Sequence, residues 1–188
     1  MVKMIKDEKV FACRAALTGK EVLDGELLGL IIAVGVQAFF VDFEMVKKVL
    51  PLFKDGDLEL VGHDLKELVK ALKYNYKMEV KNDLFDVMVA SYLLNPGNRA
   101  HDITSVLLKV LGKVLPQSAA QTNLFGVDKK GLAEELFLIG QTKDKLKQDL
   151  EAIKNEIKES RERNMESMER QLGESRRHTE KQLGESRQ

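Results

Sequence analysis

Residues 59–102 constrain the fold most, because they contain the signals for a strand, two helices and their connections in one short stretch. The apolar run Leu58–Val61 lies between a Gly-containing turn signal and Gly62, which favours a buried strand. Asp64 then precedes apolar residues at helical spacing, and we predict it to be the N-cap of a helix that extends through Leu72. The chain before this stretch has the pattern of a sheet, and the chain after it has the pattern of helices.

A second helix is predicted to begin near Asp83 or Asp86. It ends at Asn95-Pro96-Gly97, since proline has no N–H to donate and glycine permits a left-handed exit. Asp102 is the predicted cap of a third helix, which runs through Leu111. The inner face of the second helix is predicted to carry Phe85, Val89, Tyr92 and Leu93.

Three β-rich runs precede this stretch, at Lys9–Leu17, Leu27–Val34 and Gln37–Phe43. Short polar or Gly-containing turns separate them, which predicts an antiparallel meander. A helix bent or ended by Pro51 follows over Phe43–Lys54, so the next strand should lie parallel to the first. The predicted fold class is therefore α/β, with a mixed sheet, flanking helices and a long C-terminal helix.

The C-terminal part changes in composition. Residues 114–130 are irregular and are interpreted as a surface connection, and a long helical pattern begins near Asp128. After Glu159 the chain is rich in charged and polar residues, and QLGESR occurs twice. We therefore predict one domain at 1–158 and a charged tail at 159–188. This tail is either a solvated helix that frays or a coiled-coil arm through which copies associate.

Composition excludes several classes of protein. Of the 188 residues 44% are apolar, which is a globular composition, and 30 basic residues balance 30 acidic ones. Such balance argues against strong general affinity for nucleic acid. The single cysteine, Cys13, excludes an internal disulfide and fits a cytoplasmic location. The start lacks the apolar region of a signal peptide, and the longest apolar run is too short to span a bilayer, so no membrane association is expected.

Three motifs identify a resemblance. Val61–Lys66, then Phe85–Met88 with Ser91–Asn95, then His101-Asp102 resemble in order and spacing the 3′–5′ exonuclease-type domain of bacterial family A DNA polymerases, the DNA polymerase I enzymes. The resemblance covers roughly Lys9–Ala152. It implies a ribonuclease H-like fold, a polymerase domain of the same or a related chain as partner, and at most weak, auxiliary contact with DNA. No polymerase motifs follow the resemblance, so we expect a fragment or a free-standing remnant.

Exonucleases of this family use two divalent cations held by four acidic residues, because the cations must clamp the attacking and leaving oxygens. The family's Asp-x-Glu motif corresponds here to Arg14-Ala15-Ala16, so both carboxylates are missing. In the second motif Leu68 replaces the metal-binding aspartate. The third corresponds to residues 135–140, which end in Gly140 and lack both its tyrosine and its aspartate. We therefore predict a vestigial, inactive domain with no catalytic residues, no metal site and no cofactor.

Two alternatives remain open. Asp42-Phe43-Glu44 also spells Asp-x-Glu, and an active nuclease could use a relocated site built from Asp42, Glu44, Asp64 and Asp86, with Mg²⁺ or Mn²⁺ as cofactor. Position argues against it, because each of these residues stands near a predicted helix start, where an acidic side chain is favoured without any catalytic role. The other alternative is a free-standing interaction protein that oligomerises through its tail.

The histidines and the cysteine do not predict a further site. His63 and His101 have no partner at metal-ligand spacing, and His101 is expected to order the turn into its helix. Cys13 is expected to be a buried free thiol.

Overall fold

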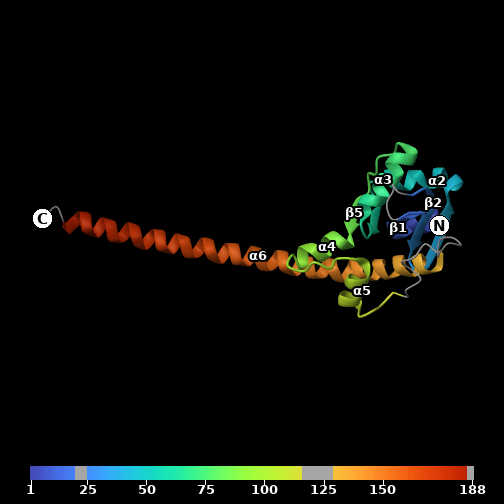
Figure 1. The fold of residues 1–188 in the computed structure, drawn as a ribbon. Coiled ribbons are helices and arrows are strands. Elements are labelled where there is room, and N and C mark those ends of the chain that lie inside the picture. Colours follow the sequence, from blue (N-terminus) through green and yellow to red (C-terminus); the bar gives the residue numbers. More distant parts are fainter. Residues whose placement is uncertain (20–24, 116–128, 186–188) are drawn as a thin grey trace. The chain divides into compact units, whose positions relative to one another are not determined.

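The computed structural model describes residues 1–19, 25–115 and 129–185, and the chain divides into two compact units, Met1–Lys147 and Gln148–Gln188. Figure 1 shows the elements of both units. Their bounds, in chain order, are α1 (Val2–Glu8), β1 (Val10–Leu17), β2 (Leu27–Val34), β3 (Gln37–Asp42), α2 (Phe43–Val49), the 3-10 helix η1 (Leu50–Lys54), β4 (Glu59–Gly62), α3 (Leu65–Tyr76), β5 (Asp83–Asp86), α4 (Val87–Leu94), α5 (Ile103–Leu111) and α6 (Lys129–Glu185).

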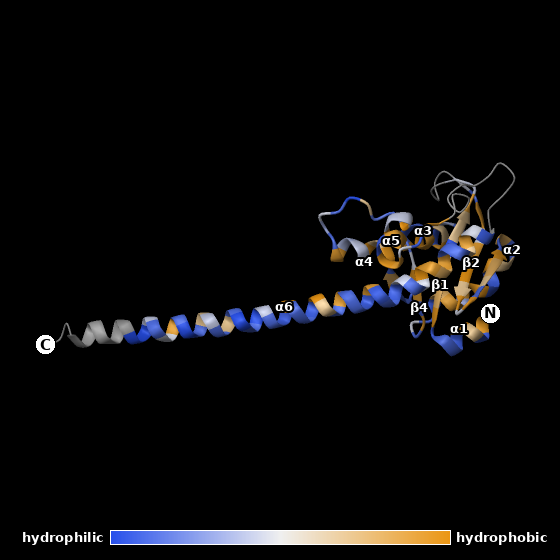
Figure 2. Cartoon of the chain, turned by 90° about the horizontal axis from the view of Figure 1, so that it is seen from below, coloured by the Kyte–Doolittle hydropathy of each residue, from blue (hydrophilic) through white to orange (hydrophobic). Residues whose placement is uncertain are grey.

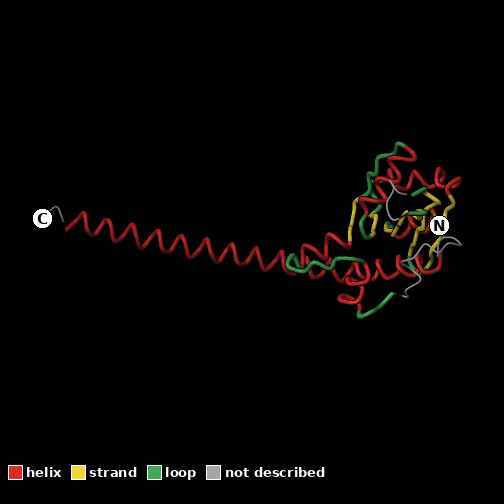
Figure 3. The backbone as a smooth tube through the Cα atoms, in the orientation of Figure 1, coloured by secondary structure: helices red, strands yellow, loops and turns green. Residues whose placement is uncertain are grey.

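A five-stranded mixed sheet forms the centre of the first unit, in the order β3-β2-β1-β4-β5. Figure 3 shows its strands in yellow. β1 pairs antiparallel with β2, and β2 pairs antiparallel with β3, which confirms the predicted meander. On its other side β1 pairs in parallel with β4, as predicted from the intervening helix. β4 in turn pairs in parallel with β5, so β3 and β5 are the two edge strands.

Two elements were not predicted. α1 precedes the first strand, and β5 occupies the region where a helix start near Asp83 was predicted, so that start was wrong and only the one near Asp86 is confirmed. β5 has four residues, too few to show the alternation by which a strand is recognised. Its pairing with β4 stabilises it instead.

The predicted inner face of α4 was also wrong. Val89, Tyr92 and Leu93 are exposed, and Phe85 belongs to β5 rather than to the helix. β5 ends at Asp86 and α4 begins at Val87, so no connecting residue separates them, and the pairing of β5 with β4 determines which residues of the helix face inward. The buried residues of α4 are Val87, Ala90 and Ser91.

One face of the sheet is covered by α1, α2, η1 and α3. Phe11 of β1 and Leu60 of β4 belong to a large apolar cluster on this face, and the ring of Phe11 meets that of Phe53 edge to face at 5.6 Å between centroids. Successive side chains of a strand point to opposite faces, so Arg14 and Glu59 lie on the other face. Both form ion pairs with residues 129–147 of α6, which therefore cover that second face (Figure 1).

The second unit, from Gln148 onward, is a single helical segment that continues α6 to Glu185. Figure 2 shows it as predominantly hydrophilic. The domain boundary predicted at 158 stays a prediction, and most of the predicted connection at 114–130 lies outside the described residues. In the described parts of the chain, no helix is both long enough and apolar enough to cross a membrane.

Candidate functional site

Arg14 and Ala16, the positions predicted to have lost the metal-binding carboxylates of the first motif, lie on β1. Arg14 and Ala16 are two residues apart and therefore share the sheet face that α6 covers. Across β2 their register partners are Ile31 and Gly29. Gly29 admits no larger residue, since a Cβ there would lie 2.3 Å from the carbonyl oxygen of Val41. No neighbour of Arg14 on these two strands supplies a carboxylate.

The acidic group that does reach this place comes from α6. An Arg14 guanidinium nitrogen, Nη1, donates a hydrogen bond to Oε1 of Glu135, and the two side chains form an ion pair. The Arg14 side chain is 43% exposed, whereas that of Glu135 is only 3% exposed. A carboxylate buried to this extent is costly unless it is paired, so Arg14 is the group that makes Glu135 tolerable in the interior. In the sequence, Glu135 is distinguished only as the first residue of the region that corresponds to the third family motif.

The other two predicted motif positions supply no ligand atom. Leu68 is 3% exposed and belongs to the apolar cluster on the α3 side of the sheet, the face opposite Arg14. Gly140 has no side chain, and it lines a cavity of about 230 Å³ together with Ala12, Val61 and other residues. The structure therefore brings Arg14 and Glu135 together and leaves Leu68 apart from them.

Asp86 is a helix cap, as predicted, but it serves two helices. Its Oδ1 accepts hydrogen bonds from the backbone N–H of Met88, at 2.9 Å, and of Asp64, at 3.2 Å. Its Oδ2 accepts from the N–H of Leu65 at 2.8 Å. One carboxylate thus satisfies donors at the start of both α3 and α4, which explains its position without any catalytic role.

Asp64 is the N-cap residue of α3, as predicted, but its side chain does not cap the helix. Its backbone is left-handed, with φ at 53°, and its side chain makes no capping hydrogen bond. In that conformation the Asp64 N–H turns toward Asp86, which takes over the capping role. Within the described chain, Oδ1 of Asp64 is buried without a hydrogen-bond partner. It is a single oxygen, and cation sites in proteins require several oxygen ligands.

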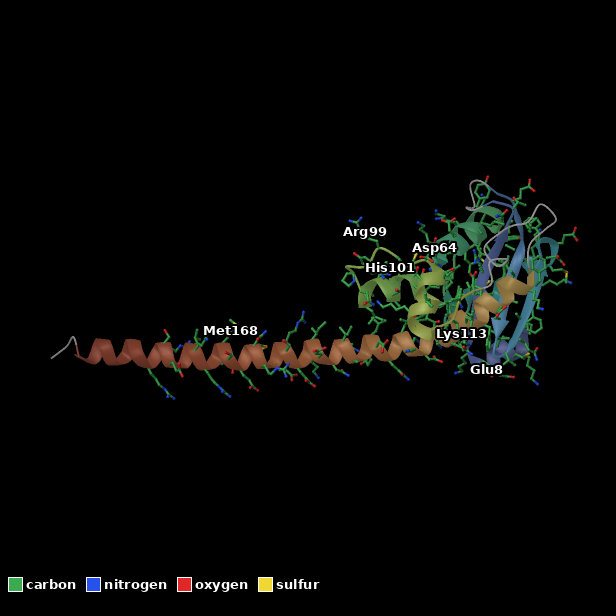
Figure 4. All side chains as sticks on the ribbon, turned by 60° about the horizontal axis from the view of Figure 1, so that its bottom comes forward. Glu8, Asp64, Arg99, His101, Lys113 and Met168 are labelled. Carbon is green, nitrogen blue, oxygen red and sulfur yellow. The ribbon has the colours of Figure 1, made fainter. Side chains whose placement is uncertain are left out.

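His101 orders the turn between α4 and α5, as expected, and His63 contacts the same turn. Nε2 of His63 lies 2.8 Å from the carbonyl oxygen of His101, and Nε2 of His101 lies 2.8 Å from the carbonyl oxygen of Asn98. Nδ1 of His101 lies 3.0 Å from the hydroxyl oxygen of Ser91, and in the neutral ring that donates through Nε2 this nitrogen accepts the hydroxyl's hydrogen bond. Figure 4 labels His101, between α4 and α5, and Asp64, at the start of α3.

Asp102 caps α5 as predicted. Its Oδ1 accepts from the N–H of Ser105 at 3.0 Å, and its Oδ2 accepts from the hydroxyl of Ser105 at 2.6 Å. The hydroxyl and then the backbone N–H of Ser105 hold the pKa of the Asp102 carboxyl below its usual range. The carboxylate next to His101 is therefore engaged in helix capping.

A relocated four-carboxylate site does not form. Asp42 ends β3 and Asp86 ends β5, and these are the two edge strands of the sheet. Four strand spacings separate them, which is roughly 19 Å at about 4.8 Å per strand, whereas the two cations of such nucleases lie about 4 Å apart. Over the described residues, no group of three or more His, Cys, Asp and Glu side chains could hold a metal ion. The available donors therefore do not fit a pair of divalent cations.

The other ionisable groups of this region serve structure. Lys143 donates to Oε2 of Glu59 at 3.0 Å, and Lys147 donates to the other carboxylate oxygen. Burial alone would raise the pKa of Glu59, but the hydrogen bonds from Lys147 and Lys143 outweigh it and hold the pKa below its ordinary value. Cys13 is a buried free thiol, as predicted, and burial raises its pKa, so it is a poor nucleophile.

The family model of the DNA polymerase I, ribonuclease H-like domain matches residues 16–115. No curated protein sequence matches the chain. Solved structures share its fold: Brucella melitensis NrnC with bound Mg²⁺ has a TM-score of 0.64 at 17% identity, over 77% of this chain and 74% of that one.

Two longer proteins are also similar. Escherichia coli RNase D, an exoribonuclease involved in structured RNA processing, has a TM-score of 0.67 at 12% identity, over 80% of this chain and 42% of its own. The POL domain of Pol1 from M. smegmatis, in complex with DNA primer-template and dNTP, has a TM-score of 0.63 at 15% identity, over 81% of this chain and 26% of its own. Identities this low show a common fold and nothing finer.

Proposed function

Because this chain belongs to the family of the DNA polymerase I ribonuclease H-like domain, we propose that it is an exonuclease-type domain that has lost metal-dependent cleavage and acts as a structural module. One observation carries the proposal. At the position that the resemblance assigns to the family's first acidic motif, the chain has Arg14, and this residue forms an ion pair with Glu135. A guanidinium cannot bind a divalent cation and repels one by its charge.

The chemistry of phosphodiester cleavage supports this proposal. In the two-metal mechanism, carboxylates position two cations that activate the attacking water and stabilise the leaving oxygen. Among the residues that the structure describes, Glu135 is the buried acidic residue, and its charge is already balanced by Arg14. Asp86 is held by three backbone N–H groups and serves as a cap. Neither residue is available to bind two cations.

The proposed partner is a polymerase domain of the same or a related chain, in the cytoplasm and in the setting of DNA replication or repair. Family membership supports this, as does the likeness to Pol1, of which this chain matches 26%. Contact with DNA would be weak and auxiliary, because the acidic and basic residues are equal in number.

A nuclease assay tests the proposed loss of activity. The purified chain is incubated with end-labelled single-stranded DNA and, separately, RNA in 10 mM Mg²⁺ or Mn²⁺, and a metal-dependent exonuclease serves as positive control. We expect no shortening of either strand. Shortening that requires metal and copurifies with the chain would contradict the proposal. An Asp64→Ala variant would then show whether a relocated site is responsible.

A second candidate function is self-association through the tail, and the surface of the second unit favours it. Within this unit Ile153, Ile157, Met165, Met168 and Leu172 are exposed, and their spacings include the steps of three and four typical of coiled coils. Figure 4 labels Met168, whose side chain projects from the helix.

We propose that a second copy of the chain binds this apolar face. Light scattering over a hundredfold concentration range is expected to show a dimer, and a monomer at every concentration would refute self-association.

A further inference from the structure

The Arg14–Glu135 pair carries an inference that rests on the proposed function and goes beyond it. We propose that the Arg14 guanidinium occupies the place of a divalent cation in this domain, and that Glu135 is a ligand carboxylate still directed at that place. The lost metal site is then a site in which a side-chain cation has replaced the metal ions. The positive charge remains, but it is now covalently part of β1.

Burial supports this assignment. Glu135 is 3% exposed on its side chain, and surface residues Glu134 and Gln141 of the same helix show that exposed positions were available nearby. A glutamate buried against a sheet is expected only where a positive group faces it. In the described chain, the positive group that contacts Glu135 is the guanidinium of Arg14. The inward direction of this carboxylate is what a cation ligand requires.

The surroundings of Arg14 point the same way. Its neighbours on the same face of β1 are Ala12 and Ala16, and both are small and buried. They leave the guanidinium room to lie over the sheet and to reach α6. The Arg14 side chain is 43% exposed, so solvent reaches it although its partner Glu135 is buried. The pair therefore links β1 and α6.

Other features of the molecule provide weaker evidence for a further site. The cavity lined by Gly140 also has Glu8, Lys143 and Asp144 on its wall, but Lys143 is already paired with Glu59 and Asp144. The pocket lined by Lys54, Lys77 and Lys81 also contains Glu79 and opens to solvent. The Ser91–His101 contact belongs to the turn between α4 and α5, and Ser91 is buried.

The proposal predicts that removal of the guanidinium opens a cation site. In an Arg14→Asp variant two carboxylates face each other, and Mn²⁺ should bind between them. At ten times its Kd, a ligand that binds only the folded state shifts the folding equilibrium roughly tenfold, which raises the Tm of a domain this size by about 3–6 °C. We therefore expect 10 mM Mn²⁺ to raise the Tm of Arg14→Asp by several degrees and to leave that of the wild-type chain unchanged.

Two controls keep the test decisive. An Arg14→Asp/Glu135→Gln variant lacks the second carboxylate and should not respond to Mn²⁺. If Arg14→Asp fails to fold, an Arg14→Ala variant leaves Glu135 facing an empty space, and millimolar ethylguanidinium should raise its Tm in place of the missing side chain. Arg14→Ala/Glu135→Gln should show no such rescue.

The outcomes separate this inference from the proposed function. A folded Arg14→Asp or Arg14→Ala chain whose Tm responds to neither cation overturns the cation replacement, and the wild-type chain is still inactive. A response that persists after Glu135→Gln also overturns it, because Glu135 would then not be the ligand. Nuclease activity of the wild-type chain would instead refute the proposed function itself.

Discussion

Replacement of Asp86 by alanine is expected to destabilise the first unit more than replacement of Asp83, the other acidic residue of β5. The carboxylate accepts three backbone hydrogen bonds, from Asp64, Leu65 and Met88, at the starts of two helices. Loss of a helix cap costs about 1 kcal/mol. Each of the two further N–H groups, left in a half-buried place without its acceptor, costs about 0.5–1.5 kcal/mol. The expected loss is therefore about 2–4 kcal/mol.

Urea denaturation followed by circular dichroism measures this loss directly. The midpoint should fall with an unchanged slope, because the same surface is exposed on unfolding. Asp83→Ala is the matched control: it removes the same side chain from the other end of β5, where Asp83 is exposed, and it should change stability by less than about 0.5 kcal/mol. Asp86→Asn keeps one oxygen acceptor and should fall between the two.

The result that would refute the reasoning is an Asp86→Ala chain as stable as Asp83→Ala. The hydrogen bonds at the starts of α3 and α4 would then contribute nothing measurable, and the assignment of Asp86 as a shared cap would fail. A loss well above 4 kcal/mol would also contradict it, since three backbone hydrogen bonds cannot account for that magnitude.

Three further predictions concern positions around the degenerate site. Leu68→Asp places a charge in the apolar cluster and should cost about 3–5 kcal/mol in urea denaturation, whereas Lys66→Asp, on the exposed side of α3, should cost less than about 1 kcal/mol. Gly29→Ala should destabilise because its Cβ meets a backbone oxygen at 2.3 Å, while Gly140→Ala, with nothing within 4 Å of the new atom, should raise stability by about 0.5–1 kcal/mol in the same assay. The carboxylate of Glu59 has a lowered pKa in the folded state, so its ionisation stabilises the fold at pH values above its ordinary pKa of 4.5. This contribution is lost as the pH falls through the folded-state pKa. Glu59→Gln should therefore make Tm less dependent on pH between about 5 and 3.

Each of these predictions has an outcome that would contradict it. A Leu68→Asp chain of wild-type stability would mean that this side chain faces solvent. Equal effects of the two glycine exchanges would mean that the packing around Gly29 is looser than the geometry indicates. A pH profile unchanged by Glu59→Gln would show that the lysine hydrogen bonds do not favour the ionised carboxylate in the fold.

The sheet was predictable to the extent that its strands have local signals. β1, β2 and β3 are long, apolar and separated by turns, so their meander could be predicted, and α2 then made the parallel return to β4 the natural topology. β5 could not be predicted, because it has four residues and exists by pairing with β4. Its presence also explains why the inner face of α4 was assigned wrongly, since a strand fixes the rotation of the helix that follows.

The candidate site was predictable as a set of missing residues but not as a set of contacts. The motif order placed Arg14 at a former carboxylate position, yet nothing local connects it with Glu135, which lies 121 residues later. The signal that could have found the pair was the position of Glu135 on the apolar stripe of the last helix, at helical spacing from Leu132 and Ile139. Asp64 and Asp86 both stand at helix starts, and only the left-handed backbone of Asp64 decides which of them is the cap.

Calorimetric titration of Mn²⁺ into the wild-type chain tests the central claim most directly, because two-metal cleavage requires two bound cations before any substrate arrives. The account predicts no saturable heat up to 10 mM Mn²⁺, since a guanidinium stands where the cations would bind and Asp86 is held by backbone N–H groups. Saturable binding of about two Mn²⁺ per chain, lost in an Asp64→Ala variant, would contradict it and identify a working metal site.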